Sequence, residues 1–224
     1  MSFADILALS NWERVYLIEI EVGHQIDGDV WIQCGAPNTN VWYISHPEGE
    51  PSRVEEDSVA YVEKASIALC QATASTWFWD VTTQRLYIHT SGSDDPAGGS
   101  YDILSFFWEY YTNMQFTDEP VIYSDHYYLP YLNSDNMPDI SMEVSDYSSG
   151  GIRTSYGTIK MINADGRWDT RLSTYIYEFK RTIIKACKKG SNVGDMGILI
   201  DSFIGDISLD DQSVEFSLTD PREQ

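Results

Sequence analysis

The clearest pattern in this sequence is an alternation of apolar and polar residues in its second half. It runs through residues 157–163 (G-T-I-K-M-I-N), 202–208 (S-F-I-G-D-I-S) and 213–219 (S-V-E-F-S-L-T). Because a period of two places successive side chains on opposite faces of a β-strand, we predict three strands here. Residues 179–187 fit a helix or a strand, and their β-branched T-I-I run favours a fourth strand.

A turn signal follows the first of these strands. Asn163, Asp165 and Gly166 belong to an N-A-D-G sequence, in which glycine tolerates a positive φ and the Asn or Asp side chain caps the turn. We predict a tight hairpin turn with Gly166 at positive φ. The alternative is a calcium loop using Asp165 and Asp169, but the alternating carboxylates and the final Glu of an EF-hand loop are missing.

The first half is also predicted to consist of short strands separated by Gly, Asn, Asp and Ser. Residues 29–34 are expected to be the hairpin partner of residues 12–22, and residues 85–90 the partner of residues 77–80. Residues 61–72 are ambiguous, and we favour strand. The remaining predicted strands are residues 41–44 and 101–111.

Composition supports a mainly β protein with a substantial core. The chain has 224 residues, of which 42% are apolar, and its 15 Tyr, 7 Trp and 8 Phe favour strands. Residues 133–151 are polar and coincide with a change in charge. We therefore predict an acidic, aromatic-rich β domain at 1–133, a linker at 134–150 and a second β domain at 151–224.

The net charge of −21 is unevenly distributed along the chain. Residues 1–150 hold 24 acids and 4 bases, a net charge of −20, whereas residues 151–190 hold nine bases and three acids, a net charge of +6. The acidic half would repel phosphate and anionic lipid headgroups, so we expect neither nucleic acid nor a membrane as a partner. The simpler interpretation is that the excess of acidic residues keeps the protein soluble.

The same asymmetry suggests that copies associate through opposite charges. We predict that basic residues of the second half face acids of an adjacent copy or of another protein, although a solvated basic face is the alternative. The candidate interface residues are Arg167, Arg171, Lys180, Arg181, Lys185, Lys188 and Lys189.

Residues that carry chemistry show no recognisable spacing. Cys34, Cys70 and Cys187 are far apart, which is typical of reduced, buried thiols, and the four histidines never form H-x-H or H-x-x-x-H. G-x-S-x-G, P-loop and G-x-G-x-x-G motifs are also missing. We predict no catalytic residues, no metal site and no cofactor, and thus a protein that is not an enzyme.

The tryptophans raise an alternative function. Aromatic rings on one face of a β-sandwich can stack on sugar rings while carboxylates bind hydroxyls, whereas core packing is the simpler explanation for them. The candidate aromatic surface comprises Trp31, Trp42, Trp77, Trp79 and Trp108. If exposed, it would make the chain a carbohydrate-binding module that attaches to host-surface glycans.

Two blocks of sequence resemble structural proteins of tailed bacteriophages. One is the hairpin cadence W-F-W-D, short turn, R-L-Y-I-H and D-D-P in residues 77–96. The other begins at residue 157, with the N-x-D-G-x-W-D turn, a basic strand, F-I-G-D-I and a closing V-E-F-S-L-T-D. An aromatic run and a Y-L-P-Y-L segment lie between them, and together the matches cover residues 60–220. Their order resembles that of tail-hub and distal-tail proteins of the tail tip or baseplate.

This resemblance implies a structural role without catalysis. It implies a β-sandwich or barrel for the N-terminal part and a small barrel-like C-terminal part. The chain would assemble in the host cytoplasm, in multiple copies and with other tail and baseplate proteins, and its final location would be the virion tail.

Overall fold

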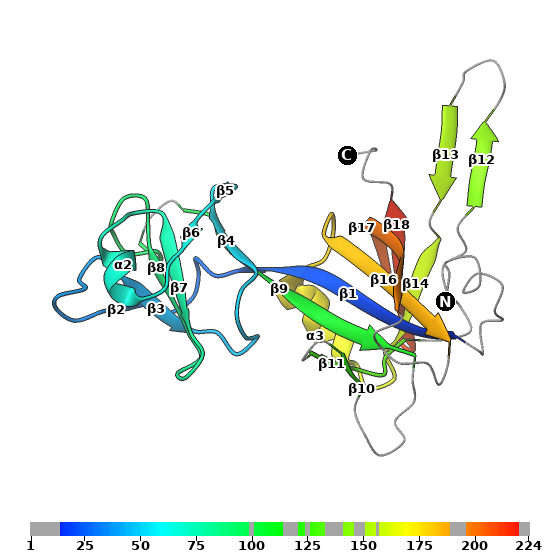
Figure 1. Ribbon diagram of the computed structural model, residues 1–224, viewed down its shortest axis with the longest axis horizontal. Helices are drawn as coiled ribbons and strands as arrows, with labels where there is room; N and C mark the ends of the chain where they lie inside the picture. Colours follow the sequence, from blue (N-terminus) through cyan, green and yellow to red (C-terminus); the bar gives the residue numbers. More distant parts are fainter. Residues whose placement is uncertain are drawn as a thin grey trace. The chain divides into compact units, whose positions relative to one another are not determined.

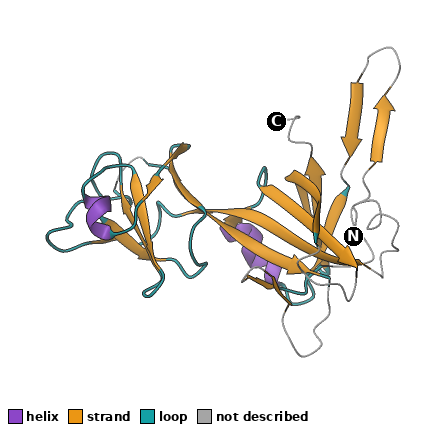
Figure 2. Cartoon of the chain, viewed as in Figure 1, coloured by secondary structure: helices purple, strands orange, loops and turns teal. Residues whose placement is uncertain are grey.

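The protein is mainly β, as predicted, and it divides into two compact units (Figures 1 and 2). The computed structural model describes residues 14–98, 101–113, 121–123, 126–132, 141–145, 151–155, 157–188 and 196–219. The inserted unit is Val22–Trp108, and the enclosing unit comprises Met1–Glu21 and Glu109–Gln224. Strands β1 (Arg14–Gln25) and β9 (Ile103–Thr112) pair with each other and contribute residues to both units.

These boundaries differ from the predicted division into 1–133, 134–150 and 151–224. The polar composition around 134–150 suggested a linker, but strand β12 (Ser141–Ser145) lies within it and pairs with β13 (Gly151–Ser155). The first of the described strands, β1, also pairs with the second half of the chain. Residue pairs such as Ile18 and Ile184 join β1 to β16, so residues far apart in sequence belong to one unit.

The sheet of the enclosing unit follows the order β14-β18-β17-β16-β1-β9, with β15 also paired to β1. The predicted strands 157–163, 179–187, 202–208 and 213–219 are confirmed by this sheet. Its elements after β1 are β14 (Thr158–Ile162), β15 (Tyr175–Ile176), β16 (Arg181–Lys188), β17 (Gly197–Leu209) and β18 (Ser213–Thr219). A further pair is β10 (Val121–Tyr123) with β11 (His126–Tyr128).

The alternation read from the sequence becomes the buried face of this sheet. Ile159 and Met161 of β14 are fully buried, and Val214 and Phe216 of β18 are buried opposite them. The side chain of Lys160 lies on the other face, where it pairs with Glu215 at 2.7 Å. Alternate positions thus bury apolar area while charged groups stay accessible to water.

A short helix covers part of the core. Helix α3 (Arg167–Thr174) buries Trp168 completely. The indole ring lies 5.5 Å from Tyr111, 5.7 Å from Tyr177 and 5.3 Å from Phe216, between ring centroids. Burying four large rings contributes several kcal/mol, on the order of 1.5–3 kcal/mol for each side chain. The helix is therefore fixed to the sheet mainly through Trp168.

The inserted unit contains a second sheet in the order β2-β3-β8-β7-β6, and β4 with β5 extends the sheet that contains β9. The predicted hairpin of residues 77–80 and 85–90 is confirmed by antiparallel pairing of β7 with β8. The elements are β2 (Ile32–Gln33), β3 (Trp42–Ser45), β4 (Arg53–Glu56), β5 (Val59–Ala60), β6 (Val62–Glu63), α2 (Ile67–Gln71), β7 (Thr76–Asp80) and β8 (Arg85–His89).

Three local predictions differ from the structure. Residues 29–34, predicted to pair with 12–22, do not pair with the described part of that segment, because β2 pairs with β3 and β1 pairs with β16 and β9. Residues 61–72 were expected to be strand, but helix α2 starts after Ser66, whose side chain accepts a hydrogen bond from the Leu69 backbone. Both paths of strands described here have two free ends, so barrel closure is not observed among the described strands.

Candidate functional site

The predicted turn at Asn163 exists, but it leads into helix α3 and not into a second strand. Gly166 has a φ of 68°, and its amide donates to the carbonyl of Asn163 at 3.0 Å. The side chain of Asn163 accepts from the Trp168 amide at 2.9 Å, and Asp165 accepts from the Arg167 amide at 3.1 Å. These bonds satisfy donors at the start of α3, so the three residues organise a helix start.

Three of the predicted interface residues contact acids of their own unit. Arg171 pairs with the buried carboxylate of Glu109. Lys185 lies 2.5 Å from Glu19, with both side chains mostly buried, and Arg181 forms an exposed pair with Asp201. Contacts between copies are therefore not needed to neutralise these three bases.

The other candidate interface residues have different environments. Arg167 stacks over the ring of Tyr131, with its guanidinium carbon 4.9 Å from the ring centroid. Lys180 is half-buried, Lys188 is exposed, and Lys189 lies outside the described residues. The prediction that this group faces another subunit remains a prediction for these four residues.

The structural units also redistribute the charge. The inserted unit contains twelve acids and three bases, a net charge of −9, so the enclosing unit holds the remaining 23 acids and 11 bases, a net charge of −12. Both units are acidic, because residues 1–21 and 109–150, which hold twelve acids and one base, belong to the same unit as the basic strands. Simple attraction between an acidic and a basic half of neighbouring copies is thus not supported.

The candidate aromatic surface is largely core. Trp31, Trp77 and Trp79 are at most 8% exposed and pack with Leu86 and Ile88 in the core of the inserted unit. Trp42 is partly buried against this cluster, and Trp108 is also only partly exposed. A sugar-stacking face made of these five rings does not exist, and the predicted alternative of core packing holds for the three buried rings.

An apolar recess lies in the enclosing unit beside α3, β15 and β17. It has a volume of about 340 Å³. Its lining residues are Leu172, Tyr175, Ile176, Tyr177, Glu178, Ile207 and Leu209. Ile176 and Leu209 are 37% and 45% exposed, so apolar side chains border the opening. Sequence alone did not indicate this recess, because its residues come from three elements.

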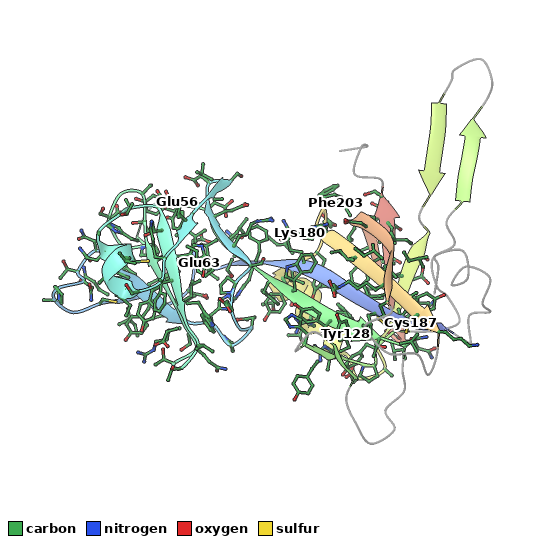
Figure 3. All side chains as sticks on the ribbon, in the orientation of Figure 1. Glu56, Glu63, Tyr128, Lys180, Cys187 and Phe203 are labelled. Carbon is green, nitrogen blue, oxygen red and sulfur yellow. The ribbon has the colours of Figure 1, made fainter. Side chains whose placement is uncertain are left out.

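A buried carboxylate requires hydrogen-bond donors, and the inserted unit supplies them to Glu56. The carboxylate, labelled in Figure 3, accepts from the Tyr61 hydroxyl and from the amide and hydroxyl of Ser91. Burial raises the pKa of Tyr61, so its hydroxyl stays protonated and donates. These hydrogen bonds connect β4 to the loop after β8, and their role is structural.

A second polar cluster in the inserted unit combines two histidines and a carboxylate. His24 is near the end of β1, while His46 and Glu48 belong to the turn after β3. Nδ1 of His24 lies 3.7 Å from Oε1 of Glu48, and Nδ1 of His46 lies 3.7 Å from Oε2 of the same residue. One candidate ligand atom from each of the three residues lies within 4.8 Å of the other two.

Backbone and side-chain contacts fix the His46 ring. The imidazole is fully buried, its Nδ1 lies 2.7 Å from the carbonyl of Gly49, and its Nε2 lies 2.9 Å from the hydroxyl of Ser105. Burial lowers the pKa of His46, whereas Glu48 and the Gly49 carbonyl oppose that change. The ring is therefore held in its neutral form.

Sequence reasoning did not predict this cluster. The prediction of no metal site rested on histidine spacing, and His24 and His46 are 22 positions apart. The turn sequence H-P-E-G was the available local signal, because it supplies two potential ligands that are two positions apart. His24 comes close to these two residues only in the folded structure.

The cysteines are reduced in this structure. Cys70 and Cys187 are buried and Cys34 is partly buried. Burial raises the pKa of Cys70 to about 11, which keeps the thiol protonated at neutral pH. Cys187 packs with Tyr128 of β11, and both are labelled in Figure 3.

No family model, curated protein or solved structure matches this chain. None of the described residues form a helix with the length and apolar character needed to cross a bilayer.

Proposed function

We propose that this chain is a structural component of a bacteriophage tail tip or baseplate, without catalytic activity. In this role it assembles in several copies and with other tail proteins. The proposal starts from the order of sequence blocks that resembles tail-hub and distal-tail proteins. Its second block corresponds to β14, α3, β16, β17 and β18, which belong to one unit, with the four strands adjacent in one sheet.

The structural observation that carries the proposal is the apolar recess of the enclosing unit. Solvent exposure of Ile176 and Leu209 costs free energy that a protein neighbour recovers by covering them. A recess of about 340 Å³ has room for a bulky side chain, the usual form of an anchor at a protein interface. We therefore propose that the recess receives a side chain from an adjacent tail protein or copy.

Charge then acts on orientation more than on affinity. The enclosing unit has a net charge of −12, so identical units repel one another at long range. Exposed bases such as Lys188 provide local exceptions that can orient a neighbour. Buried apolar contacts supply most of the association energy in this arrangement.

The carbohydrate-binding alternative has lost its main support. Three of the five tryptophans on which it depended are core residues of the inserted unit.

The proposal is tested on purified tailed particles produced by the genome that encodes the chain. We expect mass spectrometry to detect the chain and a density map to show several copies at the tail tip, with the recess covered. For a solution test, Ile176→Asp with Leu209→Asp should weaken self-association or capture by a purified tail protein at least about tenfold. The matched control is Val81→Asp, because Val81 is 76% exposed in the other unit.

Two results would contradict the proposal. One is a tail-tip map in which the chain is missing. The other is unchanged association of the Ile176→Asp/Leu209→Asp variant, with circular dichroism confirming that it is folded.

A further inference from the structure

The inserted unit contains donor atoms of the type that transition metals prefer. We infer that His24, His46 and Glu48 form a binding site for a divalent ion of the zinc class. Two imidazoles and one carboxylate match the mixed nitrogen and oxygen ligand sets of zinc, cobalt and nickel sites. Magnesium and calcium prefer sites made of oxygen atoms alone.

The spacing of the donor atoms is close to that of an occupied site. Tetrahedral zinc with bonds of about 2.0–2.1 Å places its ligand atoms roughly 3.3–3.4 Å apart. Here Nδ1 of His24 and Nδ1 of His46 each lie 3.7 Å from a different oxygen of Glu48, and one ligand atom from each residue lies within 4.8 Å of the other two. Small rotations of the His24 and Glu48 side chains would close the set around an ion. The Glu48 carboxylate already lies close to both rings.

The surroundings of His46 suit a metal ligand. An ion bound at Nδ1 requires the tautomer that carries its proton on Nε2. The Ser105 hydroxyl, 2.9 Å from Nε2, would then accept that proton, whereas it donates to Nε2 while Nδ1 donates to the Gly49 carbonyl. Metal-bound histidines usually donate their other ring proton in this way. The Gly49 carbonyl, which accepts from Nδ1 at 2.7 Å in this structure, would lose this donor and would have to move aside for the ion.

The loop that carries two of the ligands is constrained before any ion binds. The His46 amide donates to the Gln84 carbonyl at 3.0 Å, and the Gly49 amide donates to the His46 carbonyl at 3.2 Å. Gly49 has a φ of 103°, a conformation that favours glycine. The positions of His46 and Glu48 are thus largely fixed, and an ion would join this turn to His24 of β1.

The local charge also favours a cation. Asp29 is close enough to interact electrostatically with both histidines and Glu48, and Asp27 lies nearby. Burial is the main reason that the pKa of Asp29 is raised, with Glu48 adding to it and His24 opposing it. A divalent ion would relieve the repulsion among these carboxylates, within a unit of net charge −9.

The test uses the full chain after treatment with a chelator and dialysis. Titration with zinc chloride in a calorimeter should give one bound ion per chain, and the melting temperature should rise with zinc concentration. His24→Gln and Glu48→Gln should each weaken zinc binding at least about tenfold. Their melting temperatures without metal should stay near that of the wild type, because both replacements keep polar side chains of similar size.

Matched controls separate this site from other ligands. His126→Gln changes an exposed histidine of the enclosing unit, and Cys34→Ser removes the most accessible of the three thiols. Both should retain wild-type affinity, and bound cobalt should show no thiolate absorption. The inference is overturned if the wild type binds neither zinc nor cobalt, if the His24 and Glu48 variants bind as tightly as the wild type, or if Cys34→Ser abolishes binding. Should one variant not fold, the other and the cobalt spectrum still decide the question.

Discussion

Replacing Arg171 by Met should destabilise the enclosing unit much more than the same change at Arg181. Both arginines pair with a carboxylate of this unit, but their exposures differ. The side chains of Arg171 and Glu109 are 19% and 7% exposed, whereas those of Arg181 and Asp201 are 47% and 42% exposed. The Arg171→Met variant leaves the Glu109 carboxylate buried without its cation.

The expected magnitude follows from the other contacts of Glu109. Loss of one partner of a buried ion pair costs about 3–5 kcal/mol. Here the hydroxyls of Tyr111 and Tyr177 still donate to Glu109, at 2.5 Å and 3.0 Å, so we expect the lower end of this range, about 3–4 kcal/mol. Arg181→Met should cost at most about 1 kcal/mol, because water screens the exposed pair.

Thermal and urea unfolding followed by circular dichroism measure both variants. In a chain of this size about 3 kcal/mol corresponds to a fall in melting temperature of roughly 6–12 °C. The double variant Arg171→Met/Glu109→Gln should regain part of the loss, because the buried carboxylate is no longer charged. Equal losses for Arg171→Met and Arg181→Met, or a double variant no more stable than Arg171→Met, would refute the reasoning.

Three further predictions concern the turn, one hairpin and the basic strand. Gly166→Ala should lower the free energy of unfolding by about 1–2 kcal/mol because φ is 68°, and the loss should be the same with calcium or with a chelator. The control Gly28→Ala should be nearly neutral, because there is open space around a Cβ at that position. Hydrogen bonds from the Gln212 and Ser213 amides lower the pKa of Asp210, so its stabilising effect is present above its ordinary pKa and is lost as pH falls through the lowered value. The stability of the wild type should therefore fall more than that of Asp210→Ala between about pH 5 and about pH 2, the range in which carboxylates titrate. Parallel curves of stability against pH for the two proteins would contradict this prediction. Lys185→Glu should lower stability by about 1–3 kcal/mol through repulsion with Glu19, whereas Lys188→Glu at an exposed position should leave the melting temperature unchanged.

Sequence by itself determined the strands whose burial alternates along the chain. Ile159 and Met161, like Val214 and Phe216, occupy alternate positions of β14 and β18, so the local pattern alone predicted both strands. The positive φ of Gly166 was equally local, because glycine in an N-A-D-G turn has few steric restraints. What followed that turn was not determined locally. Burial of Trp168 between Tyr111, Tyr177 and Phe216 stabilises a helix there.

Only the tertiary structure decided which distant residues meet. Strand alternation fixes which side chains share a face, but it does not specify the partner strand, and β1 could pair with any strand of matching pattern. The pairing of β1 with β16 brings Glu19 to Lys185, and β9 brings Glu109 to the unit of Arg171, so bases predicted to face a neighbour are neutralised within the chain. The cluster of His24, His46 and Glu48 could not be predicted for the same reason. Hydrogen bonds and packing between separate segments bring its three side chains together, and spacing along the chain does not.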